Sequence, residues 1–482
     1  GIDPLEFKGI QYDTMLLFHM WYEEFYSFSM DALAKTFIKH KGKLKSEEIH
    51  HIGRMYGYDS VPVGLMGDYA MMDTDITLQL WQFIWPKIIE ENLDKVYLET
   101  EMPFTRLLYK MEQRGVGVRE DFVKRKVEIG RGRMETLHRL LRFNPASTKD
   151  LKEVFIDILG LPILKTTKTG KPSFTKDVME QYDEMLMYFT DEKTKDLAKR
   201  ITEYRGWQKA VTSLYEPLLS KKSPDGYIRT NFKQHGTITG RHSASNPNLQ
   251  QIPRSSNNFW NGDAKSSFFS GREGYTLIGW DYSQLELRLA AAYGNETSLI
   301  SEFENPDADP FRVLAITMFK FFSNENRQTA KTFTYASQYG AGVETISKQI
   351  NKDTAETKVL FDSYKESTPG ITKVSRDVNA IMKNRGYITY WDGRRRHMKN
   401  KSDSFKAWNS LCQGGGSQLV KKAMLKIEPY ETEDFYMVLQ VHDEIVFIIK
   451  DELIEHYRPI IEKEMTDFDI GVTLAVDSKE WQ

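Results

Sequence analysis

Two aspartates stand where apolar, strand-like segments end, although they are far apart in the sequence. Asp281 closes the segment IGWD, and Asp443 follows VLQVH 162 positions later, with Glu444 directly after it. An ionised carboxylate at the edge of an apolar sheet is costly unless a cation compensates its charge. If adjacent strands bring the pair together, divalent cations would relieve their repulsion, and all-oxygen ligands favour magnesium or manganese over zinc. The alternative is that both aspartates are turn residues of separate hairpins.

The segment RQTAKTFTYASQYG, residues 327–340, places four functional side chains at intervals of four. These four share one broad face of a predicted helix that ends at Gly340: Arg327, Lys331, Tyr335 and Tyr339. The two cations suit a triphosphate, with Lys331 placed to protonate a leaving pyrophosphate, and the two phenols offer flat faces for a base and a sugar. The spacing therefore predicts a nucleotide-binding helix. On spacing alone, a solvated amphipathic helix is the alternative.

Two further segments are rich in side chains that donate to phosphates, sugars and base edges. TITGRHSASNPNLQQIPR, residues 237–254, contains Arg241 and Arg254 among many Ser, Thr, Asn and Gln. NSLCQGGGSQLVKK, residues 409–422, contains Asn409, Gln413 and three glycines that permit close backbone approach. Either segment alone is equally compatible with a surface loop or a helix end.

The elements that must position these side chains are strands at two distant places. GYTLIGWDYS predicts a short apolar strand that ends at Asp281, and FYMVLQVHDEIVFIIK predicts two strands around a tight polar turn. About 140 residues between them are predicted to be helical. The pattern indicates one small sheet whose parts are separated by a large helical insertion. Upstream, residues 1–92 read as mixed but mainly helical, and residues 93–228 as strongly helical, with a turn-rich break at 220–227.

The composition is that of an ordinary globular protein with several domains. Its 482 residues are too many for one core and suit two to four domains, with 28% charged and 40% hydrophobic residues. The single cysteine, Cys412, excludes an internal disulfide and a cysteine zinc site, and it fits a reducing compartment. The sequence contains no apolar run long enough to span a membrane and no signal-peptide pattern.

The net charge of −2 does not by itself indicate a nucleic-acid-binding protein, but the charge is unevenly distributed. Residues 371–426 contain 13 Lys and Arg against 3 Asp, whereas residues 427–482 contain 4 Lys and Arg against 15 Asp and Glu. A basic region beside an acidic one can bind polyanions locally while the protein remains near neutral. Solvated charge on large helices is the alternative.

Together these segments resemble the family A DNA polymerases, the polymerase I family. DYSQLELR at 281–288 is similar to the family's motif A, RQTAKTFTYASQYG to motif B, and VHDE at 441–444 to motif C. The resemblance covers nearly the whole chain and includes TGRHSASNPNLQQIP, YWDGRRRHM, QGGGSQLVKKAM, EMPFTRLLYKMEQRGV and LGLPILKTTKTGKPSFT. Within motif B, KTFTY is more similar to the phage members than to the bacterial repair enzymes.

The resemblance implies an α+β fold shaped like a right hand, with a thumb at 93–228, a palm at 229–298 and 430–482, and fingers at 299–429. Residues 1–92 are similar to part of a ribonuclease H-like 3′–5′ exonuclease domain. DYAMMDTD resembles the third exonuclease motif, with Tyr69 and Asp73, whereas GIQYDTMLLFHM, with Asp13, resembles a stretch beyond the second motif. By this comparison the chain begins partway through that domain, and we expect little or no exonuclease activity.

The resemblance also implies the reaction, which is template-directed addition of deoxynucleotides to a primer 3′-hydroxyl with release of pyrophosphate. Two magnesium ions, for which manganese can substitute, would be held by Asp281, Asp443 and the backbone carbonyl of Tyr282. One ion would activate the primer hydroxyl and the other would bind the triphosphate. Lys331 and Glu444 complete the expected catalytic group.

By the same resemblance, six residues would contact the incoming nucleotide: Gln284, Glu286, Arg327, Lys331, Tyr335 and Tyr339. Glu286 would lie under the sugar and exclude a ribose 2′-hydroxyl, and Tyr339 would stack near the templating base and move when the fingers close. Five residues would bind the primer–template: Arg241, Arg254, Asn409, Gln413 and His442. All of these except Arg254 would read the minor groove, where the acceptors are alike for all base pairs.

The chain departs from the bacterial pattern in motif B and after Gln413. The departures are Gln328 in place of a second Arg, Thr334 and Ala336 in place of the usual Asn and Gly, and Gly415 and Gly416, which are expected to add flexibility. Tyr335 stands where many bacterial members have Phe, and its hydroxyl would replace the 3′-hydroxyl that a dideoxynucleotide lacks. These differences bear on fidelity, rate and sugar selection rather than on the class of reaction.

Three other functions share parts of this pattern: a 3′–5′ exonuclease, a non-catalytic primer–template-binding module and a single-subunit RNA polymerase. The pair of Asp281 and Asp443 with Lys331 argues against the binding module, and Glu286 argues against an RNA polymerase, which must admit the 2′-hydroxyl. The expected partners are primer–template DNA and deoxynucleoside triphosphates, with no membrane. We expect a monomer in the cytoplasm of a bacterium, or of an infected cell if a phage encodes it, and a helper or clamp protein is left open.

Overall fold

The centre of the protein is a four-stranded antiparallel sheet with packed layers on both faces. The computed structural model describes residues 11–40, 46–253, 256, 260–305 and 307–481. The strand order is β11-β6-β10-β9, with β6 at Tyr275–Tyr282, β9 at Phe435–Val441, β10 at Glu444–Lys450 and β11 at Val476–Glu480. Strands that are far apart in the sequence therefore form one sheet, as the sequence predicts.

Both faces of this sheet are buried, which explains why its strands are almost continuously apolar. Ile278 and Trp280 of β6 pack with helices α6 (Met102–Arg114), α20 (Ala407–Ile427) and α21 (Ile454–Thr466). Leu277 points to the other face and shares a core with α7 (Glu120–Leu141) and α12 (Glu216–Ser220). Since side chains alternate along a strand, Asp281 lies on the same face as Leu277, at the end of β6.

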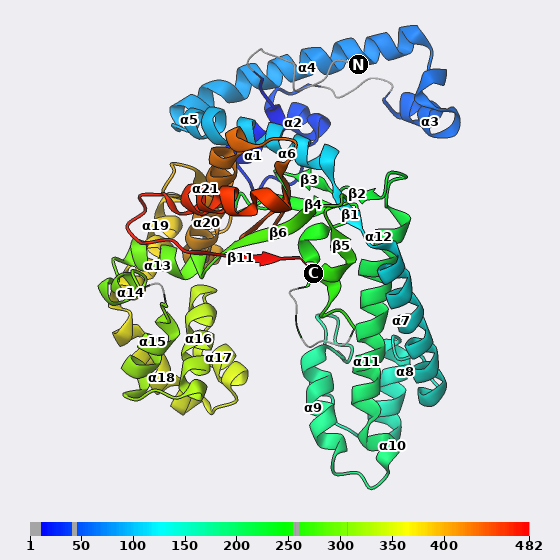
Figure 1. The fold of residues 1–482 in the computed structure, drawn as a ribbon, viewed down its shortest axis with the longest axis vertical. Coiled ribbons are helices and arrows are strands. Elements are labelled where there is room, and N and C mark those ends of the chain that lie inside the picture. The colour runs from blue at the N-terminus through cyan, green and yellow to red at the C-terminus, as the bar shows by residue number, and fades with distance from the viewer. Residues whose placement is uncertain (1–10, 41–45, 254–255, 257–259, 306, 482) are drawn as a thin grey trace.

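The predicted helical insertion forms a lobe that projects from one end of the sheet (Figure 1). Its helices are α13 (Leu285–Gly294), α14 (Thr297–Glu302), α15 (Pro310–Phe319), α16 (Asn324–Gln338), α17 (Val343–Ile350), α18 (Thr354–Ser367) and α19 (Pro369–Arg385). A short hairpin, β7 (Tyr387–Thr389) with β8 (Arg395–His397), precedes α20. Helix α20 contributes Trp408 and Leu411 to the core of this lobe and Leu419 and Met424 to the core under the sheet, so it belongs to both.

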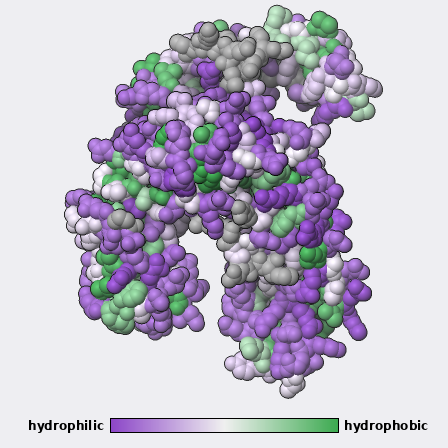
Figure 2. Space-filling view, in the orientation of Figure 1, coloured by the Kyte–Doolittle hydropathy of each residue, from purple (hydrophilic) through white to green (hydrophobic). Residues whose placement is uncertain are grey.

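A second lobe projects beside the first and consists mainly of helices, of which α7 is the longest (Figure 1). Its main helices besides α7 are α8 (Thr148–Lys152), α9 (Lys176–Leu186), α10 (Glu192–Lys195) and α11 (Leu197–Ala210), and α5 (Asp94–Val96) and α6 precede α7. Two small sheets connect this lobe to the centre, one of β1 (Val116–Val118), β2 (Tyr227–Ile228) and β5 (Phe268–Phe269), and one of β3 (Asn231–Lys233) and β4 (Ser243–Ser245). The space-filling view shows an open channel between the two lobes with mainly hydrophilic walls (Figure 2).

The N-terminal segment lies across the end of the molecule opposite the two lobes (Figure 1). Its regular elements, within the described residues up to 92, are all helical: α1 (Thr14–Trp21), α2 (Met30–Phe37), α3 (Ser46–Tyr56) and α4 (Val63–Glu90), with one short 3-10 turn. Leu17, Leu80 and Ile84 contribute to its own core. Across the described part of the chain, no helix has the combined length and apolarity needed to cross a membrane.

Candidate active site

The two predicted metal-binding aspartates lie at the same edge of the central sheet. Antiparallel pairing of β6 with β10 sets Asp281 opposite Glu444, and Asp443 occupies the tight turn just before Glu444. The backbone N–H of Tyr282 donates to the carbonyl of Asp443 at 3.3 Å, which fixes the turn against the end of β6. The prediction that adjacent strands bring the two aspartates together is confirmed. The reading of separate hairpins is wrong, because β6 lies directly beside β10.

Glu444 lies beside the pair, but its carboxylate is already bonded. Lys265 Nζ donates to both of its oxygens, at 2.8 and 2.9 Å, and Trp481 Nε1 donates to Oε1 at 2.7 Å. The carboxylate folds over Gly279, where a Cβ atom would lie only 2.0 Å from Glu444 Oε1. A catalytic role for Glu444 stays a prediction, and the contacts show a residue that ties the sheet to Lys265 and Trp481.

Arg241 joins three of the predicted motifs through one guanidinium group. Its Nη2 lies 2.9 Å from Glu286 Oε1 and 3.2 Å from Asp443 Oδ1. Burial raises the pKa of Glu286 and the charge of Asp443 raises it further, whereas Arg241 opposes both effects. The arginine that the sequence assigns to DNA binding therefore balances two carboxylates in this structure.

Helix α16 ends beside Gly340, as the sequence predicts, and begins at Asn324, ahead of Arg327. Ser323 caps its N-terminus by accepting from the backbone N–H of Asn326, and Gly340 follows its end with φ of 74°, a conformation that favours glycine. Arg327 Nε donates to Asp309 Oδ2 at 2.7 Å, and this bond raises the pKa of Arg327. Asp309 therefore orients the Arg327 side chain through its Nε atom.

The other three side chains of the predicted nucleotide face line one cavity of about 600 Å³: Lys331, Tyr335 and Tyr339. The ring of Tyr335 packs against Phe311 with centroids 5.8 Å apart. Burial raises the pKa of Tyr339, and the neighbouring charge of Glu286 adds to this. Tyr339 thus lies where the helix meets the carboxylate cluster.

The start of α13 connects the strand of Asp281 to α16. Gln284 precedes this helix with φ of 56°, and its side-chain Oε1 is buried with no hydrogen-bond partner among the described residues. Gln338 of α16 donates to the backbone carbonyl of Glu286 at 3.3 Å. The hydroxyl of Tyr282 donates to the carbonyl of Met465 at 2.6 Å, which anchors the ring away from the aspartates.

The predicted primer–template residues are divided between two elements. Asn409 and Gln413 lie on α20, and the Oδ1 atom of Asn409 is buried without a partner in the described part of the chain. His442 is exposed with φ of 58° and lines a cavity of about 230 Å³ together with Arg241 and Lys421. Arg254 lies outside the described residues.

The expectation that glycines after Gln413 add flexibility is wrong. Gly414, Gly415 and Gly416 are buried inside the unbroken helix α20. A Cβ atom at Gly414 would lie 2.1 Å from the ring of Tyr390, and one at Gly415 would lie 2.6 Å from the hydroxyl of Tyr293. The glycines therefore let neighbouring aromatic side chains pack tightly against the helix.

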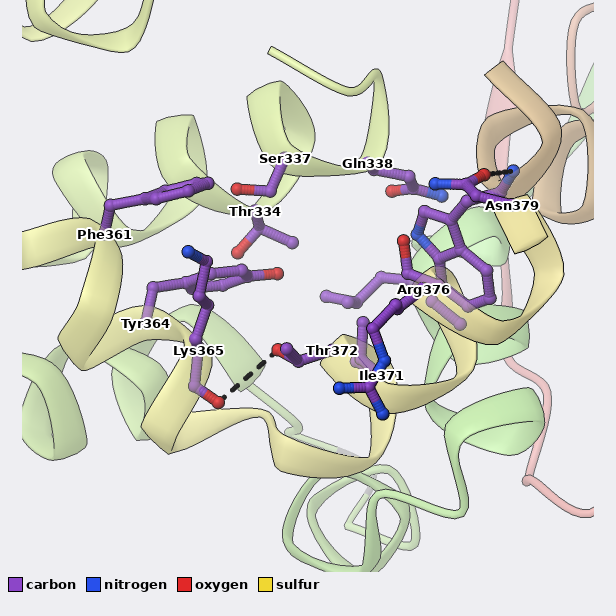
Figure 3. A pocket seen from close by; sticks show the side chains of 14 residues that line it. Thr334, Ser337, Gln338, Phe361, Tyr364, Lys365, Ile371, Thr372, Arg376 and Asn379 are labelled. Carbon is purple, nitrogen blue, oxygen red and sulfur yellow. Dashed lines mark hydrogen bonds between the residues drawn. The ribbon is translucent and has the colours of Figure 1, made fainter. Parts of the chain in front are cut away.

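A separate cavity of about 470 Å³ lies on another side of α16, next to the predicted nucleotide face. Figure 3 shows Thr334, Ser337 and Gln338 facing Phe361 and Tyr364 across it. Its walls come from the facing sides of α13, α16, α18, α19 and α20. It is distinct from the cavity that Lys331, Tyr335 and Tyr339 line.

The predicted exonuclease residues Tyr69 and Asp73 lie on α4, in the N-terminal segment. Asp73 lines a cavity of about 530 Å³ with Tyr12 and Trp81. Asp13 caps helix α1 by accepting from the backbone N–H of Leu16 at 3.1 Å. Asp73 is the only carboxylate among the described residues that line this cavity.

The basic run at 394–397, part of the predicted basic region, is directed into the protein. Four acidic partners that are distant in the sequence bind it, through Arg394–Glu101, Arg395–Glu91, Arg396–Glu24 and His397–Glu23. These four residues of the region 371–426 are therefore paired within the protein and are not arranged to bind a polyanion. No local spacing predicts these partners, because three of the four belong to the N-terminal segment.

The sequence of this chain matches those of known proteins. Residues 119–481 match the family model described as DNA polymerase family A. The chain is 30% identical over 505 residues to the DNA polymerase I of Pseudomonas aeruginosa, a match that covers 98% of this chain and 54% of that protein. It is 25% identical over 524 residues to the DNA polymerase of Escherichia phage T5, covering 94% of this chain and 58% of that protein. The chain spans about half the length of these relatives.

The fold agrees with a solved structure, the POL domain of Pol1 from M. smegmatis in complex with DNA primer-template and dNTP. The TM-score is 0.84 at 24% identity, and the match covers 97% of this chain and 81% of that one. The predicted α+β right-hand fold is thereby confirmed. The sheet edge with Asp281 and Asp443, the helix with Lys331 and the family match lead to one conclusion: this chain belongs to DNA polymerase family A.

Proposed function

We propose that this protein is a template-directed DNA polymerase that adds deoxynucleotides to a primer 3′-hydroxyl and releases pyrophosphate. One observation carries the proposal: Asp281 and Asp443 meet at one sheet edge, and Tyr339 extends the nucleotide face of α16 to the same place. The channel between the two lobes is wide and open at the surface, which suits a long substrate (Figure 2). The domain limits proposed above, with thumb, palm and fingers, fit this arrangement.

Family A polymerases depend on metal ions, and we propose two magnesium ions, with manganese as a substitute. Asp281, Asp443 and the backbone carbonyl of Tyr282 form an all-oxygen donor set at the sheet edge, which suits such hard cations. Within the described residues no group of three or more His, Cys, Asp or Glu side chains is arranged to hold a metal, so substrate oxygens would complete the site. Bound there, the ions would activate the primer hydroxyl and neutralise the triphosphate.

The residues of the chain then have separable roles. Lys331 reaches the phosphates from α16 and protonates the leaving pyrophosphate, and Arg327 joins it through the guanidinium N–H groups that Asp309 does not hold. Glu286, held by Arg241, limits the space under the sugar. Tyr335, Tyr339 and Gln284 contact the base and sugar, and Asn409, Gln413 and His442 contact the primer end.

Primer extension is the experiment that tests this function. A labelled primer on a longer template is incubated with magnesium and deoxynucleotides, and in parallel with ribonucleotides. Extension with deoxynucleotides only supports the proposal, whereas efficient use of ribonucleotides identifies an RNA polymerase. Binding without extension identifies a non-catalytic module, and shortening of the primer identifies an exonuclease.

We further propose that this chain has little or no proofreading activity. The cavity that Asp73 lines offers one carboxylate among its described residues, whereas a two-metal nuclease site needs several. Incubation of a mismatched primer with magnesium and no nucleotides tests this, and steady removal of the mismatch would contradict it. We also propose that the protein acts as a monomer in the cytoplasm.

A further inference from the structure

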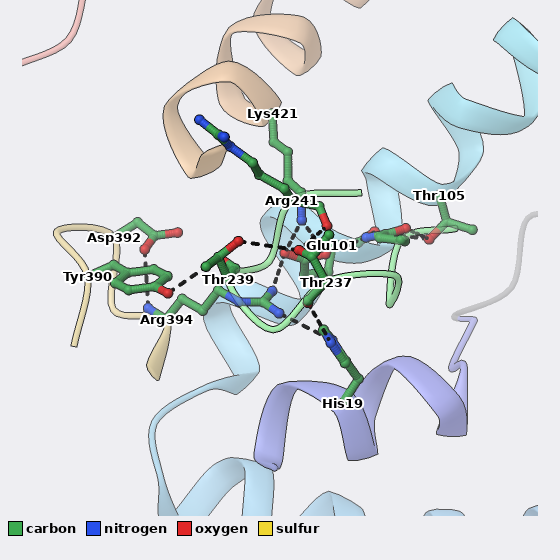
Figure 4. A network of polar contacts seen from close by, with 11 residues as sticks. His19, Glu101, Thr105, Thr237, Thr239, Arg241, Tyr390, Asp392, Arg394 and Lys421 are labelled. Carbon is green, nitrogen blue, oxygen red and sulfur yellow. Dashed lines mark hydrogen bonds and ion pairs between the residues drawn. The ribbon is translucent and has the colours of Figure 1, made fainter. Parts of the chain in front are cut away.

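The loop that carries Arg241 is held by the N-terminal helix α1. His19 Nε2 lies 3.0 Å from the carbonyl oxygen of Thr237, a contact between residues 218 positions apart. Thr237 Oγ1 in turn donates to the carbonyl of Arg241 at 2.6 Å. Figure 4 shows His19 reaching from α1 to this loop, residues 237–241. The chain of bonds therefore runs from the N-terminal segment to the arginine that binds Glu286 and Asp443.

The environment of His19 fixes how the imidazole bonds. The side chain is buried, and its Nδ1 lies 3.5 Å from Arg394 Nη2. Burial, and then the charge of Arg394, lowers the pKa of His19 to about 3, so the ring is neutral at physiological pH. Because a carbonyl oxygen can only accept, Nε2 carries the hydrogen and Nδ1 accepts from Arg394. The neutral imidazole of His19 therefore links the carbonyl of Thr237 to the guanidinium of Arg394.

A buried cluster supports the other side of the loop. Arg394 bonds to Glu101, and Lys421 Nζ lies 2.8 and 2.9 Å from the two oxygens of Glu101. Burial would raise the pKa of Glu101, but Lys421 and Arg394 outweigh it and hold the pKa at about 2. The guanidinium of Arg394 lies under Gly240, where φ is 84° and a Cβ atom would be 2.8 Å from Arg394 Nε.

We propose that His19 is a positioning residue of the polymerase site, which holds the loop 237–241 and thereby orients Arg241 on Glu286 and Asp443. The N-terminal segment is then part of the synthetic site, beyond any role in exonuclease chemistry. The expected effect of His19 on the rate of primer extension rests on the proposed function. The structural consequence of the inference, a loop ordered by His19, can be measured without any reaction.

A double-mutant cycle in the complete chain tests the kinetic consequence. We expect His19→Ala to lower kcat for single-nucleotide extension roughly tenfold, the effect of losing one buried hydrogen bond that holds the loop. In an Arg241→Ala background the same change should have little further effect, because coupled residues are not additive. Trp21→Phe is the matched control: Trp21 also lies on α1 but bonds to Glu91 at 3.0 Å, and this variant should keep the parent rate.

Hydrogen–deuterium exchange of the free protein tests the structural consequence. Amides of residues 237–242 should exchange faster in His19→Ala than in the parent and Trp21→Phe, and His19→Gln, which retains an N–H donor, should restore most of the protection. Thr237→Val, which removes the hydroxyl bonds to Arg241 and Thr239 within the loop, should lower kcat even if His19→Ala does not fold. The inference would be overturned if His19→Ala lowered kcat by the same factor in the parent and in Arg241→Ala. It would also be overturned if His19→Ala changed neither kcat nor the exchange of these amides. A parent that fails to extend primers refutes the proposed function instead, and the exchange comparison still decides this inference.

Discussion

Two arginine–carboxylate clusters lie a short distance apart in this protein and are built differently. In the inner cluster Glu101, Arg394 and Lys421 are almost fully buried, with side-chain exposures of 2%, 4% and 1%. In the edge cluster Arg241 is 25% exposed and is shared between Glu286 and Asp443. Removing one partner from a buried set leaves an uncompensated charge, whereas a shared, partly hydrated partner can be exchanged. The inner cluster is therefore suited to holding the surrounding structure in place. The edge cluster is suited to the binding of cations and substrate.

The largest expected effect is on synthesis and falls on the edge cluster. Asp443→Ala and Asp281→Ala should each lower the extension rate by about a thousandfold or more, because charge stabilisation at the reacting phosphate is lost. Primer–template binding, measured by fluorescence anisotropy, should survive, since basic residues provide most of the affinity for a duplex. Asp477→Ala is the control, because Asp477 lies opposite Asp281 on β11 and bonds to Ser283. A rate near that of the parent in either aspartate variant would contradict the two-metal assignment.

The next effect is on stability and falls on the inner cluster. Glu101→Gln leaves Lys421 and Arg394 without their buried partner and should lower the free energy of unfolding by about 3–5 kcal/mol in a urea titration. Glu216→Gln, which breaks an exposed pair with Arg131, is the control and should cost less than about 1 kcal/mol. Equal losses of unfolding free energy in the two variants would show that the buried ion pairs stabilise the protein no more than the exposed pair does.

Acid should weaken the inner cluster in a defined range of pH. The pKa of Glu101 falls from 4.5 to about 2 on folding, so its contribution to stability is complete above pH 4.5 and is lost as the pH falls toward 2. The size of this contribution is roughly 3 kcal/mol. Urea titrations at pH 6, 4.5 and 3.5 should show a steeper decline for the parent than for Glu101→Gln. Parallel declines would mean that Glu101 is not the titrating group.

A smaller effect on selectivity is expected at Glu286, the other carboxylate of the edge cluster. Glu286→Ala should admit ribonucleotides, because the side chain no longer excludes the 2′-hydroxyl by contact and desolvation. The expected change in the ratio of deoxynucleotide to ribonucleotide incorporation is roughly one to two powers of ten. Competition on a single template measures the ratio, and unchanged discrimination would remove Glu286 from this role.

The smallest expected effect concerns one hydroxyl on α16. Tyr335→Phe should make the protein discriminate against dideoxynucleotides by roughly 1–3 kcal/mol, the value of one replaced hydrogen bond in a desolvated site. The ring contact with Phe311 survives in this variant, so stability should not change. Competition between dideoxynucleotides and deoxynucleotides gives the ratio. Equal selectivity in the two proteins would mean that Tyr335 acts only as a packed ring.

The edge cluster was largely predictable from the sequence, whereas the inner cluster was not. Asp281, Asp443 and the face of α16 follow from patterns within single segments, namely an apolar strand, a tight turn and a repeat of four. The contact of Arg394 with Glu101 joins residues 293 positions apart, and that of His19 with Thr237 joins residues 218 apart. Local patterns contain no information on such pairs. The same holds for Asp309, which binds Arg327, and for Lys265, which binds Glu444.

Gly279 shows how a position that does no chemistry can be as vulnerable as a catalytic one. Any other amino acid there would add a Cβ atom 2.0 Å from Glu444 Oε1, between Lys265 and the strand that carries Asp281. In a library of random single-nucleotide changes, every missense change of a glycine codon introduces that atom. A genetic screen for inactive variants should therefore recover Gly279 alongside Asp281 and Asp443. The screen would then group residues that fail for different reasons. At Gly279 there is no space for a side chain, whereas at Asp281 and Asp443 a substitution removes a negative charge.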